Sequence, residues 1–166
     1  MGNFPNSRFI EDFSVGDEFF TGSFTLDEDS LLSFSREYDP QPLHTDPNYA
    51  RMGPFGGLIA SGIQTIAISI KLFVEMGFFH GTCLAGPAID EIRFTQPVRA
   101  GDTIRCKVTI LEARSSKKNP ARGVLRTYYE VFNQSDLEVL SHKTTTIIQS
   151  RHYKAENTSH MPERMK

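Results

Sequence analysis

A carboxylate and an imidazole stand five residues apart in the segment Tyr38-Asp-Pro-Gln-Pro-Leu-His-Thr-Asp46. They are Asp39 and His44, and enzymes use both side-chain types to accept and deliver protons. Pro40 and Pro42 lack a backbone N–H and fix their own φ, so we expect a stiff, irregular loop here and no helix. Proton transfer depends on position as much as on pKa, so this loop is a candidate acid–base site.

The same residue types also have structural uses, and these set the alternatives. An aspartate near a histidine is often only a turn former or a helix cap. Asp46 precedes Pro47, an arrangement typical of an N-cap followed by the first helical residue, so we interpret it as a cap. A metal site from Asp39, His44 and Asp46 is disfavoured because no further His or Cys lies nearby in the sequence. We predict neither a metal nor a cofactor.

The first half of the chain places short elements around this loop. Residues 18–26 are aromatic and rich in threonine, which is typical of a strand. Asp27 or Asp29 can cap a helix that leads into the loop. A short helix is expected to start at Pro47 and to end at the glycine-rich segment 53–57. The candidate site therefore lies between two helices.

A long apolar helix is predicted next, from near Ala60 to about Met76. Apolar residues cover most of its circumference, so other structure should enclose it. Small residues recur every four positions, at Ser61, Thr65 and Ser69, and would let a sheet approach closely. Polar residues interrupt the stretch, which indicates a buried helix rather than a membrane span.

The second half of the chain is almost entirely strand. Four strand-like runs separated by turn signals occupy residues 86–96, 102–113, 123–133 and 138–149. Strands that follow one another through short turns form an antiparallel sheet. Together with one very apolar helix, this predicts an α+β fold in which the sheet wraps around the helix. We expect a single domain over residues 1–150 and a polar tail over 151–166.

The composition is that of one globular domain. The chain has 166 residues and a net charge of −2, which leaves no strongly basic face for a nucleic-acid partner. Cys83 and Cys106 form no metal-spaced pair and suggest a reducing compartment. The first residues contain no apolar run typical of a signal peptide. We therefore expect a cytoplasmic protein with no nucleic-acid and no membrane partner.

Several motifs, taken in order, resemble the MaoC-like dehydratases, a hot-dog-fold family that includes the (R)-specific enoyl-CoA hydratases. The family pattern is Asp, any residue, Asn or Gln, any residue, an aliphatic residue and His. It is matched here by Asp39, Gln41, Leu43 and His44. The resemblance continues at Phe55-Gly-Gly-Leu-Ile-Ala-Ser-Gly62, Ile89-Asp-Glu-Ile-Arg93, Gln96-Pro-Val-Arg-Ala-Gly-Asp102 and Ser115-Ser-Lys-Lys-Asn-Pro-Ala-Arg-Gly123. The best-characterised hydratases carry Asn at the position of Gln41, and many carry His at that of Ser61.

The resemblance implies reversible hydration of a trans-2-enoyl thioester, carried by coenzyme A or an acyl-carrier protein. Asp39 and His44 would hold one water molecule. Asp39 would accept its proton as hydroxide adds to C3, and His44 would orient the water and assist proton delivery to C2. We expect the two side chains to converge beside the first turn of the long helix.

The start of that helix suits an anionic intermediate. Backbone N–H groups near Ser61 and Gly62 have no partner within the helix, and the helix dipole favours an anion there. Gly62 lacks a β-carbon and would let a carbonyl approach closely. Ser61 lies outside any Gly-x-Ser-x-Gly elbow, so we interpret it as a cap or a carbonyl contact. Gln41, Gly57, Ser61 and Gly62 are our candidate substrate-binding residues.

The basic run 114–122 carries four positive charges. It is either a solvated hairpin tip or a cradle for the phosphates of coenzyme A. On the second interpretation, Lys117 and Lys118 bind substrate.

Two other functions remain open. Hot-dog thioesterases usually place a carboxylate on the long helix or just before it, whereas Glu75 lies near its far end. A thioester-binding protein whose Asp/His pair does not turn over is the other alternative.

Assembly is the last expectation. One sheet curled around one helix covers the helix incompletely and leaves two sheet edges. A symmetric dimer removes both problems, so we predict an obligate homodimer, alone or as the unit of a larger ring.

Overall fold

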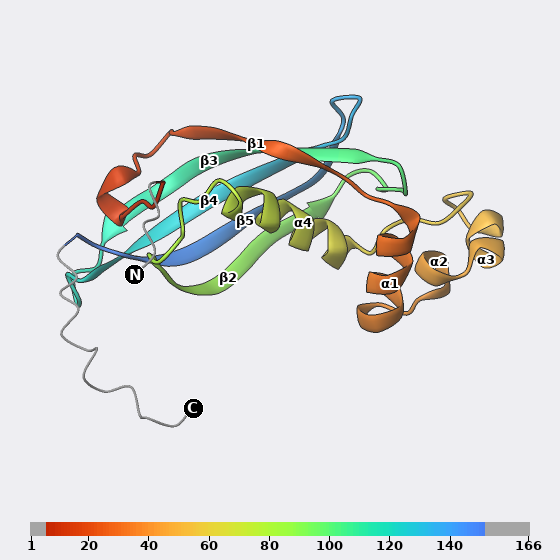
Figure 1. The fold of residues 1–166 in the computed structure, drawn as a ribbon, viewed down its shortest axis with the longest axis horizontal. Coiled ribbons are helices and arrows are strands. Elements are labelled where there is room, and N and C mark those ends of the chain that lie inside the picture. Colours follow the sequence, from red (N-terminus) through yellow and green to blue (C-terminus); the bar gives the residue numbers. More distant parts are fainter. Residues whose placement is uncertain (1–5, 152–166) are drawn as a thin grey trace, which may run out of the picture.

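The computed structural model describes residues 6–151, which form one antiparallel sheet with helices on its concave side and at one end (Figure 1). The strands are β1 (Glu18–Thr25), β2 (Cys83–Phe94), β3 (Thr103–Ser115), β4 (Arg122–Phe132) and β5 (Glu138–Gln149). The helices are the 3₁₀ turn η1 (Ile10–Asp12), α1 (Glu28–Tyr38), α2 (Pro42–Thr45), α3 (Pro47–Met52) and α4 (Gly62–Val74). The predicted tail lies outside the described residues, apart from Arg151.

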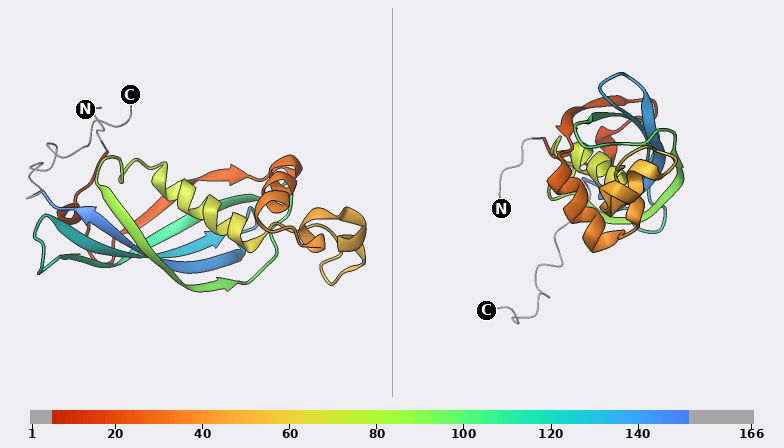
Figure 2. Two further views of the ribbon diagram at one scale, coloured as in Figure 1. Left: turned by 90° about the horizontal axis from the view of Figure 1, so that it is seen from below. Right: turned by 90° about the vertical axis from the view of Figure 1, so that its right-hand side faces the viewer.

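The sheet has the strand order β1-β3-β4-β5-β2, and it curves around α4 (Figure 2). Alternate residues of the central strands point to the concave side of the sheet, toward α4 and η1, and are buried: Ile104, Cys106, Val108 and Ile110 of β3, and Leu125, Thr127, Tyr129 and Val131 of β4. The predicted α+β architecture is confirmed. Helices α1, α2 and α3 lie at one end of the sheet, next to the start of α4 (Figure 1).

Small residues let α4 lie close to the sheet, as expected. Ser61, Thr65 and Ser69 are all buried. The Ser69 hydroxyl donates to the carbonyl of Ile66 at 2.7 Å, and its oxygen lies 2.9 Å from Nε2 of His142 on β5. None of the helices within residues 6–151 is long and apolar enough to cross a membrane.

One local prediction is wrong. Pro40 and Pro42 do not exclude a helix, because Pro42 begins the one-turn helix α2. Proline suits this first position since an N–H there has no partner within a helix and the fixed φ is already helical. His44 therefore lies on a helical turn. Asp46 caps α3 as predicted, by accepting hydrogen bonds from the next backbone N–H groups.

Within one chain, α4 is enclosed on the side that faces the sheet and, near its start, by α1, where Gln64 is buried and donates to the Ser30 carbonyl. On its other side, the side chain of Ile63 is 56% exposed. Strand β2, at the edge of the sheet, is also exposed along almost its whole length, including Ile89 near its centre. The expected enclosure of the helix on all sides is thus not met by a single chain.

His142 gives the fold a pH dependence. Its ring is fully buried and stacks on Tyr129, with ring centroids 4.4 Å apart. Burial lowers the pKa of His142 to about 4, compared with about 6.5 in an unfolded chain. Between these values the unfolded chain binds a proton that the folded protein does not, so stability falls as the pH falls.

We therefore expect the unfolding midpoint to drop between pH 6.5 and pH 4, with a loss of up to about 1.4 kcal/mol per pH unit. His142→Gln should flatten this dependence, because glutamine can still donate to Ser69 but does not titrate. Urea unfolding of both proteins across this pH range measures the effect. An equal slope in the variant would show that His142 is not responsible.

Candidate active site

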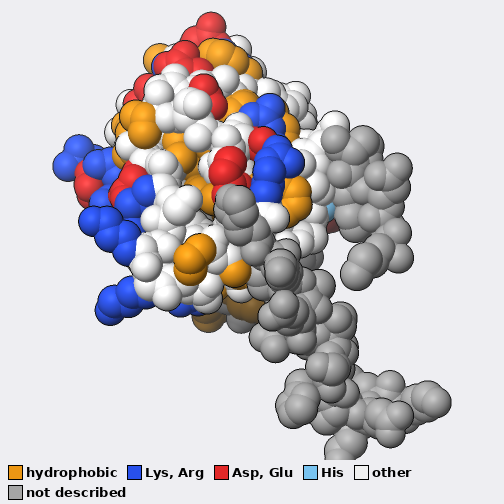
Figure 3. All heavy atoms as spheres, turned by 90° about the vertical axis from the view of Figure 1, so that its left-hand side faces the viewer, with side chains coloured by type: hydrophobic (Ala, Val, Ile, Leu, Met, Phe, Trp, Pro, Cys, Tyr) orange, Lys and Arg blue, Asp and Glu red, His pale blue; other side chains and the backbone are white. Residues whose placement is uncertain are grey.

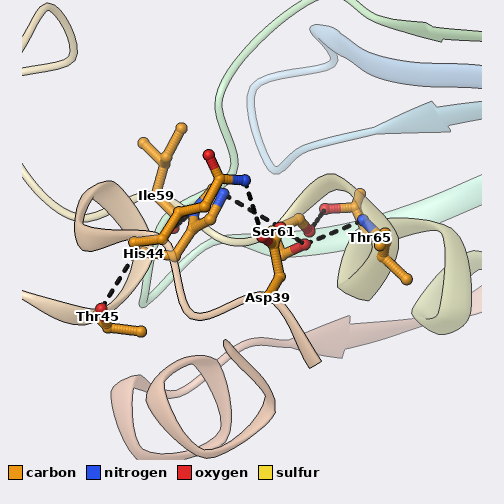
Figure 4. Close-up of polar contacts among 8 residues, drawn as sticks. Asp39, His44, Thr45, Ile59, Ser61 and Thr65 are labelled. Carbon is orange, nitrogen blue, oxygen red and sulfur yellow. Dashed lines mark hydrogen bonds and ion pairs between the residues drawn. The ribbon is translucent and has the colours of Figure 1, made fainter. Parts of the chain in front are cut away.

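Asp39, His44 and Ser61 meet where the end of α1 passes the start of α4 (Figure 4). Asp39 is the C-cap residue of α1 and Ser61 is the N-cap residue of α4. The Ser61 hydroxyl donates to Oδ2 of Asp39 at 2.6 Å, and the same oxygen lies 3.5 Å from Nε2 of His44. Two helix ends and the turn α2 thus bring the acid–base pair to the first turn of α4.

The orientation of His44 is set by the backbone. Its Nδ1 lies 2.8 Å from the carbonyl oxygen of Ile59. A carbonyl only accepts, so Nδ1 carries the proton and, in the neutral ring, Nε2 offers a lone pair. Nε2 and Oδ2 of Asp39 are then two acceptors facing each other. A water molecule is suited to this place, because it can donate to both.

Neighbouring donors keep Asp39 ionised. The Ser61 hydroxyl and the Gln41 side-chain amide, which donates to Oδ1 at 2.8 Å, both lower the pKa of Asp39. Partial burial raises this pKa, and the balance of all causes lies below the usual carboxyl value. Asp39 is therefore available as a proton acceptor. Gln41, predicted to bind substrate, here contacts the carboxylate.

For a reaction in which Asp39 accepts a proton, Ser61→Ala should move the acidic limb of the pH profile of kcat/KM to higher pH. The change removes the hydrogen bond that lowers the pKa of Asp39 most, so the pKa rises. Since only the ionised carboxylate accepts a proton, activity is lost as the pH falls through this pKa. Thr45→Ala is the control, because its hydroxyl donates to the Gln41 carbonyl rather than to Asp39. An unshifted limb in Ser61→Ala would contradict this role.

The first turn of α4 offers a donor beside this pair. The Ser61 side chain caps the N–H of Ile63 at 3.3 Å. The N–H of Gly62 has no acceptor within residues 6–151. It lies at the positive end of the helix dipole, where a developing negative charge is stabilised.

Phe94, at the end of β2, was not predicted from the sequence. A β-carbon on Gly62 would lie 2.5 Å from Cζ of this ring, which is an overlap. The space that we expected a substrate carbonyl to use above the Gly62 Cα is thus filled by an aromatic ring. Gly62 and Phe94 are far apart in sequence, and no sequence motif indicates their contact.

Arg99 was also missed. Its guanidinium donates to the carbonyls of Phe55 and Leu58, at 2.5 and 3.2 Å. These bonds hold the segment that leads to Ile59, the backbone partner of His44. Gly57, predicted to bind substrate, does not line the cavity described next, and a β-carbon at this position would lie 3.4 Å from the Arg99 guanidinium. Arg99 stands in the motif Gln96–Asp102, so the family resemblance contained a signal that could have pointed to this residue.

A cavity of ≈ 470 Å³ opens at the acid–base pair. Its polar lining includes Asp39, Gln41, His44 and Ser61, together with Thr65, Thr95 and Gln96. Most of its wall is apolar, with Leu43, Phe55, Ile59, Ile63 and Phe94. A largely apolar cavity with a few convergent polar groups is typical of a site for a small organic molecule. Within residues 6–151, no three His, Cys, Asp or Glu side chains are grouped as a metal site requires.

The hairpin that carries Lys117 and Lys118 lies at the opposite end of the sheet (Figure 1). Ile148 of β5 pairs with Cys83 on one side and with Gly123, next to the hairpin, on the other. From Cys83 the strand β2 runs its full length to the active site, roughly 30 Å away. Lys and Arg side chains gather along one side of that far end (Figure 3). The structure thus does not bring these lysines to Asp39 and His44 within one chain.

An antiparallel sheet wrapped around one long helix is the hot-dog fold. Residues 13–131 match the family described as "MaoC like domain", and the chain belongs to this family. The resemblance found in the motifs is therefore confirmed. The family includes hydratases and dehydratases, which is the general class to which this protein belongs.

Individual relatives match this chain over different lengths. YdeM from Bacillus subtilis is 34% identical, over 84% of this chain and 97% of its own. The 3-hydroxyacyl-thioester dehydratase Z from Mycobacterium tuberculosis is 31% identical, over 56% of this chain and 62% of its own. A solved structure of a MaoC-like dehydratase from Rhodospirillum rubrum is 31% identical, with a TM-score of 0.80 over 87% of this chain and 99% of that one.

Proposed function

We propose that the protein adds water reversibly to a trans-2-enoyl thioester, with Asp39 and His44 as the groups that bind and deprotonate the water. The observation that carries this is the pair of facing acceptors, Oδ2 of Asp39 and Nε2 of His44, 3.5 Å apart beside the start of α4. The acyl group of a thioester of coenzyme A or an acyl-carrier protein fits the largely apolar cavity, and a thioester substrate agrees with the dehydratase among the relatives.

The proposed reaction starts from a water molecule held between Asp39 and His44. The water donates to both members of the pair, Asp39 accepts a proton, and the resulting hydroxide adds to C3. The C2–C3 π electrons move to the thioester oxygen, where the N–H of Gly62 stabilises the charge. The proton is then returned to C2 with the assistance of His44, so that the sum is the addition of one water molecule.

Hydration of crotonyl-CoA tests the proposal. Loss of enoyl-thioester absorbance without release of free thiol supports a hydratase. Thiol release would indicate the thioesterase alternative, which the structure favours less because α4 carries no acidic residue and Glu75 lies beyond its far end, paired with Lys71. Tight binding of crotonyl-CoA with neither change would indicate a thioester-binding protein.

We also propose that the active unit is a homodimer that pairs the exposed β2 edges around a two-fold axis. The apolar face of α4 at Ile63 and the edge residue Ile89 support this, because one pairing covers both. Antiparallel pairing of two β2 strands sets the Cys83 end of one beside the Phe94 end of the other. Lys117 and Lys118 would then serve the partner's site, where the phosphates of coenzyme A enter.

A further inference from the structure

The ring of Phe94 closes one side of the candidate active site. Three of its carbons, Cζ and the two Cε atoms, lie 2.5 to 3.0 Å from the position that a β-carbon on Gly62 would occupy. The side chain is nevertheless 56% exposed. The tip of the ring therefore contacts the start of α4, and the remaining surface of the ring faces the cavity.

A β-bulge determines that Phe94 points this way. Asp90 pairs with Lys143 of β5, and Arg93 pairs with Ser141, so two residues of β2 lie opposite one residue of β5. The extra residue inverts the alternation of side chains, and Phe94 faces the helix side like its partner on β5. Without the bulge, the ring would point to the outer face of the sheet.

The bulge is held by charge as well as by pairing. Glu91 has a φ of 53°, a left-handed conformation that is uncommon for a residue with a β-carbon. Its carboxylate lies 2.5 Å from Nζ of Lys143 and 3.7 Å from a guanidinium nitrogen of Arg126. Such conformations persist where the surroundings enforce them, and often next to functional sites.

From this arrangement we propose that Phe94 limits the size of the acyl group that the site accepts, and that position 62 is glycine to make room for its ring. The inference rests on the proposed function, since it takes the Gly62 N–H as the site of the thioester oxygen. An oxygen bound there lies about 3 Å from that nitrogen. Any acyl group that follows it must pass along the ring of Phe94.

A double-mutant cycle tests the contact without any assay of activity. Gly62→Ala should lower the melting temperature by about 5 °C in the wild-type background, because the new methyl group overlaps the ring. In the Phe94→Ala background it should no longer lower it, since alanine suits a helix better than glycine. An equal loss in both backgrounds would overturn the steric part of the proposal.

Calorimetric binding of butyryl-CoA and dodecanoyl-CoA tests the size limit. These saturated thioesters cannot be hydrated, so the measurement stands whether or not the protein is a hydratase. Phe94→Ala should raise the affinity for dodecanoyl-CoA relative to butyryl-CoA by at least about tenfold. The matched control is Phe20→Ala, an exposed phenylalanine on the opposite edge strand β1. An unchanged ratio in Phe94→Ala, or no binding of either thioester to the wild type, would overturn the proposal.

Discussion

Asp39→Asn and His44→Ala should each lower kcat for hydration of crotonyl-CoA by about 100-fold or more. Asparagine keeps the shape of the side chain but cannot accept the proton, and alanine removes the second acceptor for the water. Because the two groups bind the same water molecule, their effects should not add. The double variant should be little slower than either single variant.

Asp29→Asn is the matched control for this experiment. It makes the same carboxylate-to-amide change in the first turn of α1, where the side chain is exposed. Wild-type melting temperatures must accompany each loss of turnover, so that unfolding is not mistaken for chemistry. If both single variants at the active site turned over at nearly the wild-type rate, the assignment of the pair would be wrong.

Ile89→Glu should abolish the dimer and, with it, the folded and active state. Ile89 lies near the centre of the exposed edge strand, on the face turned toward α4, where it lines a cavity with Ile70 and Val74. The proposed two-fold pairing would bury the new charge there without a partner. An unpaired buried charge costs several kcal/mol, which is comparable to the stability of a whole domain. Light scattering at micromolar concentration should report twice 18.7 kDa for the wild type.

Phe20→Glu tests whether the effect is specific to this edge. It puts a charge on an exposed residue of β1, at the opposite edge of the sheet, and should leave the dimer intact. A wild-type protein that is monomeric, fully folded and active at micromolar concentration would refute the proposed dimer.

Local sequence patterns predicted the helices and strands well, because the side-chain spacing of each element depends on residues that are close together in the chain. The alternation along β3 and β4 follows from a strand with one buried face, and the buried stripe of Ser61, Thr65 and Ser69 matches the turn of a helix. The error at α2 had a local cause too. Proline was treated as a helix breaker, although at the first helical position it is favourable.

The sequence by itself determined the family, the antiparallel sheet around one helix and the presence of an Asp/His pair, since each depends on residue types at fixed short spacings. Only the tertiary structure decided how the site is assembled. Arg99 holds the segment next to His44, Phe94 fills the space above Gly62, and the hairpin with Lys117 and Lys118 lies at the far end of the sheet. These relations join segments distant in sequence, through strand order and a one-residue bulge, and no local pattern encodes them.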